Sequence, residues 1–244
     1  MTLVTGGTGL IGGEVILALA RARRPVAAVV RASSPEHARH RLLERLRKSQ
    51  GYSAAYADWV QAIPGDSERP HFGVGFGEDA GIRTVIHCAA NTSFSERDRD
   101  SIWATNVGGA EQLIALARRA MPAARIVFVS TASVVTGPPQ TCVTEEQAFG
   151  GHENTYTQSK REAERLMASS GLDVVIVRPS IVLSRGVDDR AMARSILWAL
   201  PIMLEIGEVP VDPEAFVDVV PADFVADAII KLALAPRQIG RAHI

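Results

Sequence analysis

The amino-acid sequence predicts an α/β fold, a doubly wound parallel sheet covered by helices on both faces. Short apolar runs alternate with segments of helical periodicity along most of the chain, which is the pattern of strands joined by crossover helices. A glycine-rich turn stands between the first apolar run and the first helical segment. The 244 residues are enough for one sizeable α/β domain with a small additional lobe.

Six apolar runs are the predicted strands, each short and followed by a turn or a helical segment. They are Met1–Val4, Val26–Val30, the run that stops before Gly65, Thr84–Cys88, Arg125–Ser130 and Asp173–Val177. Helical periodicity separates them at Leu10–Arg23, Pro35–Lys48, Tyr52–Val60, about Asp98–Ala120 and Tyr156–Ser169. Pro122 ends the long fourth helix. The segment Gly137–Asn154 contains two prolines and three glycines, which predicts a loop.

The alternation weakens beyond residue 185. A helix is predicted near Arg190–Leu200, and another at Ala222–Leu234 after Pro221. We therefore expect the regular core to occupy residues 1–184 and a smaller lobe to occupy residues 185–244.

Composition and charge exclude several classes of protein. The formal net charge is −1, so nothing indicates nucleic-acid binding. The longest apolar stretch, Ile196–Ile206, is far shorter than the roughly 20 residues of a membrane span. Cys88 and Cys142 cannot form a disulfide framework, and no Cys/His cluster has metal-ligand spacing, so no metal site is expected. A strand follows Met1 directly and leaves no room for a signal peptide, so we expect a soluble, cytoplasmic protein.

The glycine-rich turn has the spacing of a dinucleotide-binding fingerprint. It reads Thr5-Gly6-Gly7-Thr8-Gly9-Leu10-Ile11-Gly12, directly after a strand and at the start of a helix. Glycines at 6, 9 and 12 allow a tight turn, close approach of a pyrophosphate and close packing of helix on strand. The helix N-terminus presents free N–H groups to the phosphates. The pattern predicts a Rossmann-type nucleotide site that uses Thr5, Gly6, Thr8, Gly9, Leu10, Ile11 and Gly12.

The end of the second strand predicts the cofactor. An acidic residue there would hold the ribose 2′-hydroxyl of NAD, but the chain has Arg31 instead, with no acid until Glu36. A guanidinium can make charge-assisted contacts with a 2′-phosphate, which favours NADPH. Arg41 on the following helix is a second candidate for this contact.

Three residues further along have the spacing of one kind of active site. Thr131 ends the fifth predicted strand, and Tyr156 and Lys160 follow on a helix. Residues four apart lie on the same helix face, so the Lys160 ammonium can sit near the Tyr156 phenol and lower its pKa. The Thr131 hydroxyl would complete a polar grip on a carbonyl oxygen.

With these motifs, the sequence resembles the extended short-chain dehydrogenase/reductases, and within them the thioester-reductase and fatty-acyl-reductase branch. Further matching segments are spread over nearly the whole chain: Val30-Arg31-Ala32, Gly65-Asp66, Ile86-His87-Cys88-Ala89-Ala90-Asn91-Thr92-Ser93-Phe94, Asn106-Val107-Gly108-Gly109, Ala163-Glu164 and Val177-Arg178-Pro179-Ser180.

The resemblance implies roles for these segments. Asp66 would approach the adenine, and Ala89 and Ala90, followed by Asn91, would line the cofactor groove. Pro179 and Ser180, followed by Ile181, would flank the nicotinamide. Asn106 would help to position Lys160 through water and so join the catalytic residues Thr131, Tyr156 and Lys160.

The resemblance also implies the reaction, which is NADPH-dependent reduction of an acyl thioester to an aldehyde or alcohol. The substrate would be carried on an acyl or peptidyl carrier protein or on coenzyme A, and the protein would be a monomer or homodimer. Residues 1–184 would form the NADP-binding Rossmann core. Residues 185–244 would be a partial substrate-binding lobe, interleaved with the last strand of the core and either compact or truncated.

Two residues depart from the branch pattern: Ala110 stands where Thr is usual, and Arg161 stands where an aromatic residue often follows the lysine. Other assignments of function therefore stay open. The fold also carries nucleotide-sugar epimerases or dehydratases and hydroxysteroid-type dehydrogenases. A non-catalytic NADP-sensing regulator is an alternative of another class.

Overall fold

The computed structural model describes residues 1–77, 80–135, 154–184, 203, 205–207 and 218–236. Its centre is a six-stranded sheet in the order β3-β2-β1-β4-β5-β6, with every neighbouring pair parallel. The strands are β1 Thr2–Thr5, β2 Val26–Val30, β3 Val60–Pro64, β4 Thr84–His87, β5 Arg125–Val129 and β6 Asp173–Val177. The predicted doubly wound parallel sheet is confirmed.

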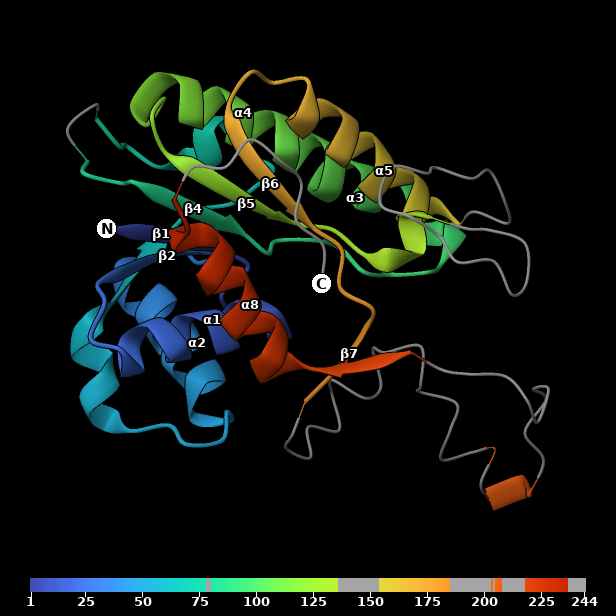
Figure 1. Ribbon diagram of the computed structural model, residues 1–244, viewed down its shortest axis with the longest axis horizontal. Coiled ribbons are helices and arrows are strands. Elements are labelled where there is room, and N and C mark those ends of the chain that lie inside the picture. The colour runs from blue at the N-terminus through green and yellow to red at the C-terminus, as the bar shows by residue number, and fades with distance from the viewer. Residues whose placement is uncertain (78–79, 136–153, 185–202, 204, 208–217, 237–244) are drawn as a thin grey trace.

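Helices cover both faces of the sheet (Figure 1). One face carries α1 Leu10–Arg21, α2 Pro35–Arg47 and α8 Ala222–Leu234, and the other carries α3 Arg99–Trp103, α4 Gly109–Ala120 and α5 Thr155–Ala168. Although α8 comes more than 200 residues after α1, the two helices pack against each other.

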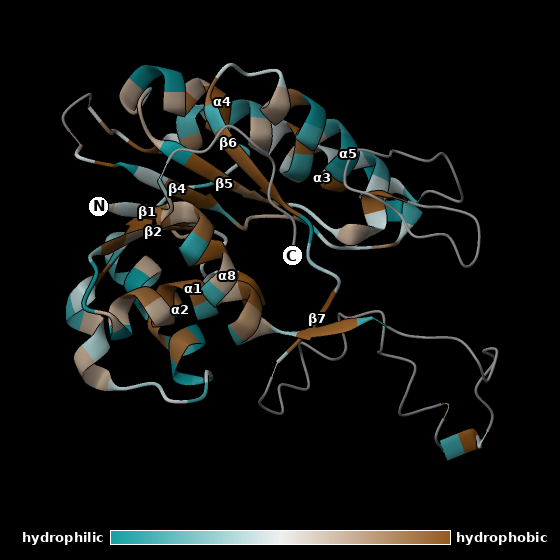
Figure 2. Cartoon of the chain, viewed as in Figure 1, coloured by the Kyte–Doolittle hydropathy of each residue, from teal (hydrophilic) through white to brown (hydrophobic). Residues whose placement is uncertain are grey.

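The core consists of two apolar layers, one on each face of the sheet. Alternate residues along a strand enter different layers: Val4 packs with the α1, α2 and α8 side chains, whereas Leu3 packs with those of α4 and α5. The strands are therefore apolar on both faces, as the brown colouring of the central strands in Figure 2 shows. This double burial explains why the strands appear as continuous apolar runs in the sequence.

The order of the strands reverses between β1 and β4, because the chain first runs outward to β3 and then crosses back. In open α/β sheets, ligands bind at the carboxyl ends of the strands at this switch point. The loops after β1, β2, β3, β4 and β5 all open toward this edge, which positions the candidate site.

The structure also departs from the predicted elements. The helix expected over Asp98–Ala120 is divided into α3, a π-helical turn at Ala104–Gly108, and α4. The helical piece expected at Tyr52–Val60 is a 3₁₀ helix over Ala54–Trp59. Hydrophobic periodicity does not distinguish these helix types, since they bury similar faces over a single turn.

A second small sheet was missed by the sequence analysis. The strands β7 Ile181–Leu183 and β8 Val219–Pro221 pair in parallel outside the main sheet. Each is only three residues long, which is too short to give a recognisable period. The helix predicted near 190–200, residues 196–202 of the apolar stretch and residues 137–153 of the predicted loop lie outside the described residues.

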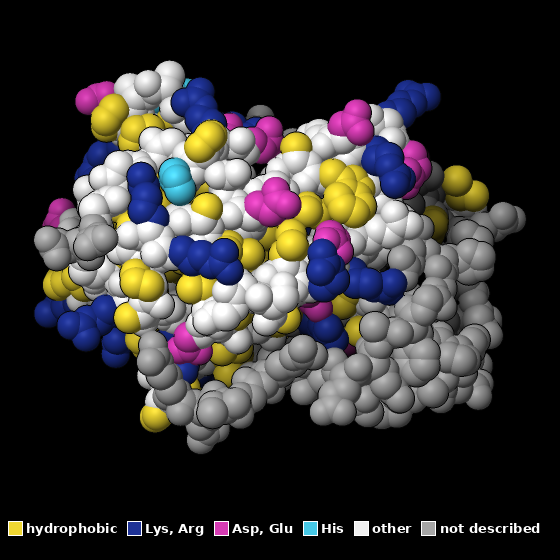
Figure 3. All heavy atoms as spheres, turned by 90° about the horizontal axis from the view of Figure 1, so that it is seen from above, with side chains coloured by type: hydrophobic (Ala, Val, Ile, Leu, Met, Phe, Trp, Pro, Cys, Tyr) yellow, Lys and Arg dark blue, Asp and Glu magenta, His cyan; other side chains and the backbone are white. Residues whose placement is uncertain are grey.

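Basic and acidic side chains are interspersed on the face over α4 and α5 that Figure 3 shows. Within the described ranges, no helix combines the length and the apolar character needed to cross a bilayer. The same residues contain no group of three or more His, Cys, Asp or Glu side chains that could hold a metal ion.

Candidate active site

The glycine turn after β1 packs its backbone against the loop after β4. Gly6 has a φ of +71°, and a Cβ there would lie 2.5 Å from the Cys88 carbonyl carbon and the Ala89 nitrogen. A Cβ at Gly12 would collide with the Gly6 carbonyl oxygen. Both positions therefore require glycine, one for its backbone conformation and both for close approach.

The turn leads directly into α1, whose first residues are Leu10 and Ile11. Gly9 is the N-cap, and no side chain caps the helix or places a carboxylate in its first turn. The N-terminal N–H groups and the positive end of the helix dipole are thus left to an anion. Thr8 and Gly9 are exposed at this point, as a phosphate-binding turn requires.

Arg45 of α2 holds the glycine turn in place by hydrogen bonds. The sequence analysis missed this role. Its guanidinium donates to the carbonyl oxygens of Gly9 and Leu10, each at 3.1 Å. It also pairs with Glu14, and the Ser49 hydroxyl donates to the same Glu14 oxygen at 2.6 Å. No motif marks Arg45, because it acts across two helices that only the fold brings together.

Thr5 connects β1 to β4 rather than facing outward. Its hydroxyl oxygen lies 2.8 Å from Nδ1 of His87, and the Ala89 N–H donates to it at 3.4 Å. The His87 ring is buried between the rings of Phe72 and Phe128, at centroid distances of 6.1 and 5.5 Å. Burial, aided by the positive charge of Lys160, lowers the pKa of His87 to about 3.

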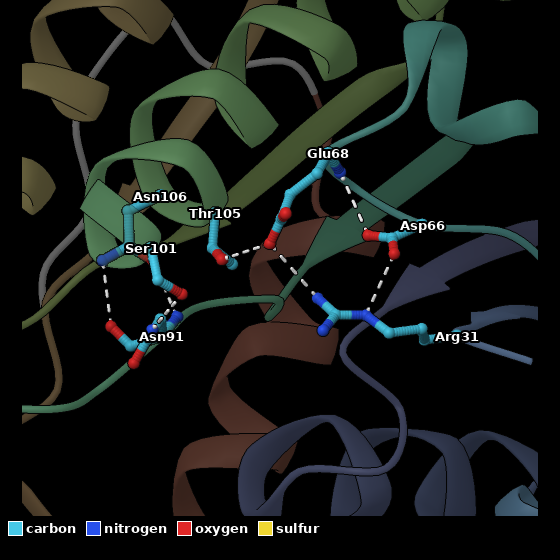
Figure 4. A network of polar contacts seen from close by, with 7 residues as sticks. All are labelled: Arg31, Asp66, Glu68, Asn91, Ser101, Thr105 and Asn106. Carbon is cyan, nitrogen blue, oxygen red and sulfur yellow. Dashed lines mark hydrogen bonds and ion pairs between the residues drawn. The ribbon is translucent and has the colours of Figure 1, made fainter. Parts of the chain in front are cut away.

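Arg31, Asp66 and Glu68 meet beyond the carboxyl ends of β2 and β3, and we call this cluster the adenosine end, after the cofactor group proposed below to bind there. Arg31 Nε lies 3.1 Å from Asp66 Oδ2, and Arg31 Nη2 lies 3.4 Å from Glu68 Oε1 (Figure 4). Arg41 donates from α2 to the carbonyl oxygen of Arg31. The sequence selected Arg31, Arg41 and Asp66 separately, and the structure places all three at one end with Glu68 among them.

The loop after β4 is held by Asn106, which lies in the π-helical turn. Asn106 Oδ1 accepts from the Asn91 N–H at 2.7 Å, and its Nδ2 donates to the Asn91 carbonyl oxygen at 3.0 Å. The same amide donates to the Ser159 hydroxyl at 2.8 Å, and Ser159 donates to the Tyr156 carbonyl oxygen at 2.7 Å. Asn106 thus links the Ala89–Asn91 loop to α5.

Thr131 lies close enough to the Tyr156 phenol to influence its pKa. We call Tyr156, Thr131 and Lys160 the catalytic end, after the role proposed for them below. Burial raises the pKa of Tyr156 to about 12, and the Thr131 hydrogen bond opposes that rise. We expected Lys160 to lower this pKa, but burial is the largest influence and the pKa is raised instead.

Lys160 lies deeper than Tyr156. Its Nζ donates to the Val129 carbonyl oxygen at 2.7 Å and stands 4.6 Å from the centroid of the Phe128 ring. Burial lowers its pKa to about 8, and the carboxylate of Glu164 raises it in opposition. Glu164 is itself paired with Arg178 at 2.6 Å in a nearly buried ion pair.

The start of α5 is fixed by side chains on both sides of it. The Asn154 side chain accepts from the Thr157 N–H at 2.9 Å. Glu96 accepts from both the N–H and the hydroxyl of Thr155. Arg161, which departs from the branch pattern, donates to the Val134 carbonyl oxygen at 2.9 Å and so ties α5 to the turn after Thr131.

Pro179, Ser180 and Ile181 lie beside the catalytic end. The Pro179 carbonyl oxygen accepts from the Ala132 N–H at 2.8 Å, directly after Thr131. The Ser180 hydroxyl donates to the Asp218 carbonyl oxygen, and Ile181 begins β7. Phe94 packs edge-on against the Tyr156 ring at 5.5 Å and is 47% exposed.

This parallel sheet, its glycine turn at the switch point and the Tyr-x-x-x-Lys helix define an NAD(P)-dependent oxidoreductase of the short-chain dehydrogenase/reductase type. The family model described as "Male sterility protein" matches residues 4–229, and the chain belongs to that family. The resemblance to the extended, thioester-reductase branch is confirmed by this match and by the relatives below.

One relative is a nonribosomal peptide synthetase, asaC, of Aspergillus flavus, which is 30% identical over 98% of this chain and 25% of its own length. Among solved structures, the terminal R domain from the myxalamid PKS-NRPS pathway matches with a TM-score of 0.85 and 27% identity, over 99% of this chain and 64% of that one. A thiolation-reductase di-domain from an archaeal nonribosomal peptide synthetase matches with a TM-score of 0.78 and 25% identity, over 95% of this chain and 67% of that one.

Proposed function

We propose that this protein uses NADPH to reduce an acyl thioester carried on the phosphopantetheine arm of a carrier protein or on coenzyme A. The observation that carries the proposal is that Thr131 and Tyr156 lie close together, with the buried ammonium of Lys160 one turn further along the same helix as Tyr156. The relatives support the substrate class, since one is a nonribosomal peptide synthetase and one solved structure joins a reductase to a thiolation domain.

The described residues fit a dinucleotide. The glycine turn is a cradle that side chains at Gly6 or Gly12 would fill, and the start of α1 has no side-chain cap, which leaves its N–H groups for an anion. These groups would hold the pyrophosphate, Ala89 and Ala90 would line the groove, and Pro179 and Ser180 would flank the nicotinamide. Arg31 would contact the 2′-phosphate, which is the basis for choosing NADPH over NADH.

When bound, NADPH supplies a hydride to the thioester carbon. Tyr156 and Thr131 would donate hydrogen bonds to the oxygen as it gains negative charge, and such donors are typically worth a few kcal/mol each. A raised pKa suits Tyr156 to this task, because the phenol stays protonated at neutral pH and remains a donor. Lys160 would add positive charge one helical turn further along α5.

The products follow from the balance of atoms. Hydride addition and loss of the sulfur as a thiol, which takes up one proton, give an aldehyde and the oxidised cofactor. A second NADPH and a second proton would convert the aldehyde to an alcohol. The ratio of NADPH consumed to thiol released therefore separates the two outcomes, at one for the aldehyde and two for the alcohol.

The first test mixes the purified protein with NADPH and a panel of acyl-pantetheine and acyl-coenzyme A thioesters, following cofactor absorbance and free thiol together. Coupled loss of NADPH and appearance of thiol is the expected result. NADPH binding with no thiol release from any thioester would contradict the proposal. Turnover of a sugar nucleotide or of an alcohol would then favour the dehydratase or dehydrogenase reading, and binding with no turnover would favour the regulator.

A further inference from the structure

The carboxylate of Glu68 lies between two elements that bound the adenosine end. Its Oε1 accepts from the Thr105 hydroxyl at 2.7 Å on one side and lies 3.4 Å from Arg31 Nη2 on the other. Figure 4 shows this bridge running from Arg31 through Glu68 to the helical turn that carries Thr105 and Asn106. Nothing in the sequence motifs pointed to Glu68.

The two carboxylates on Arg31 are not equivalent. Asp66 contacts the inner nitrogen, Nε, at 3.1 Å, and its second oxygen accepts from the Glu68 N–H at 3.1 Å, so it is fixed on both sides. Glu68 contacts the outer nitrogen, Nη2, at the longer distance of 3.4 Å. The Arg31 side chain is 62% exposed and that of Glu68 is 39% exposed, so water screens their contact. The pair of Arg31 and Glu68 is therefore the one that can open at small cost.

The carboxylates on Arg31 oppose the ligand that Arg31 would recognise. With Arg41, whose guanidinium donates to the Arg31 carbonyl oxygen, two guanidiniums and two carboxylates sum to zero, whereas a 2′-phosphate monoester carries about −1.5 to −2 at pH 7. A phosphate that takes the place of the Glu68 carboxylate at Nη2 would remain beside that carboxylate. Thr105 is 6% exposed and would keep that carboxylate close, because its hydroxyl is held in the helical turn.

We propose that Glu68 is a specificity-determining residue: it is the counter-ion that Arg31 exchanges for the 2′-phosphate, and its charge limits the preference for NADPH over NADH. This inference rests on the proposed function, in so far as it takes NADPH to be the cofactor. With Glu68 in place, two effects weaken NADPH binding: the contact between Glu68 and Arg31 is lost, and the Glu68 carboxylate repels the 2′-phosphate. Neither effect weakens NADH binding, because NADH has no 2′-phosphate.

The test is the Glu68→Gln variant, whose amide oxygen can still accept from Thr105 while the charge is gone. Dissociation constants are measured by direct titration, without thioester, for NADPH and NADH, and for 2′,5′-ADP and 5′-AMP, which differ only in the 2′-phosphate. We expect NADPH and 2′,5′-ADP to bind about two- to fivefold more tightly to the variant, while NADH and 5′-AMP change by less than about 1.5-fold. The gain should shrink as salt is raised, since the contact is exposed.

The matched control is Glu162→Gln, which removes the same charge from a glutamate on α5 that pairs with Arg165 instead. It should leave all four constants unchanged. Equal affinity of parent and Glu68→Gln for 2′,5′-ADP, in a parent that prefers NADPH, would overturn the role of Glu68 and leave the proposed function standing. Weaker binding of NADH and 5′-AMP to Glu68→Gln would also overturn it, because Glu68 would then be holding the ribose hydroxyl. A parent that prefers NADH would overturn the NADPH assignment together with this inference.

Discussion

At the catalytic end of the groove Lys160 is 2% exposed, whereas at the adenosine end the Arg31 side chain is 62% exposed. The properties of Lys160 and Tyr156 are set by desolvation, which moves both pKa values by more than any named neighbour does. The charges at the adenosine end are instead set by competition among Arg31, Asp66 and Glu68 in the presence of water. We therefore expect the loss of a single atom at the buried end to have a large effect on activity. A change at the exposed end should have a smaller effect, and that effect should depend on salt.

The largest effect should come from removing one oxygen at the buried end. Tyr156→Phe keeps the ring that packs on Phe94 but loses the hydroxyl whose pKa Thr131 influences. We expect kcat to fall by about 100-fold or more, with the NADPH dissociation constant changed by less than about threefold. Steady-state kinetics and direct cofactor titration measure the two quantities.

Tyr52→Phe is the matched control, because Tyr52 packs beside the α1 core away from this end and should tolerate the change. If Tyr156→Phe keeps the parental kcat, Tyr156 has no part in the chemistry. The expected difference in sensitivity between the buried and the exposed end would then be wrong.

The next largest effect should come from reversing the charge at the exposed end. Arg31→Asp places a third carboxylate beside Asp66 and Glu68, so we expect NADPH to bind about 10- to 100-fold more weakly while NADH is nearly unaffected. The ratio of the two dissociation constants, measured at low and high salt, is the observable. Arg24→Asp makes the same charge change beyond α1, at the opposite edge of the sheet, and should leave that ratio alone. An unchanged ratio in Arg31→Asp would refute the 2′-phosphate contact.

A third prediction concerns His87, whose protonation we expect to be controlled by burial. Its pKa is about 3 in the folded protein and about 6.5 when exposed, so between these values the unfolded chain binds one more proton. Stability should therefore fall as the pH drops from 6.5 toward 3, by up to about 1.4 kcal/mol per pH unit from this residue.

Urea unfolding at a series of pH values checks the contribution of His87. The His87→Phe variant keeps a ring between Phe72 and Phe128, and its stability should depend on pH less steeply by about one proton. His40→Gln, a change at an exposed histidine, should keep the parental slope. Equal slopes in parent and His87→Phe would mean that His87 is not held neutral by burial.

The smallest effect concerns the mouth of the catalytic end. Phe94 is exposed beside Tyr156, and we expect Phe94→Ala to raise KM for an apolar acyl thioester about two- to tenfold, the range of one aromatic contact. Phe224→Ala removes an exposed ring from α8 and should have no such effect. If neither KM nor kcat responds to Phe94→Ala, this ring has no part in substrate binding.

Some parts of the site were readable from the sequence because they depend on local spacing. The glycines of the first turn, the strand that leads to Thr131 and the four-residue step from Tyr156 to Lys160 are each fixed within one or two turns of chain. Glu68 and Arg45 were not readable, since each acts on a residue from another element. Glu68 meets Arg31 across 37 residues and Arg45 meets Gly9 across 36.

The sequence by itself determined the fold class, the position of the glycine cradle and the identity of the hydroxyls and the ammonium at the catalytic end. These follow from apolar periodicity and from the spacing of residues close together in the sequence, and neither depends on contacts between distant segments. Only the tertiary structure decided that the Tyr156 pKa is raised, that α8 packs on α1, and that Arg31 faces two carboxylates. Burial and charge pairing depend on which distant segments of the chain come into contact, and those contacts form only when the whole sheet folds.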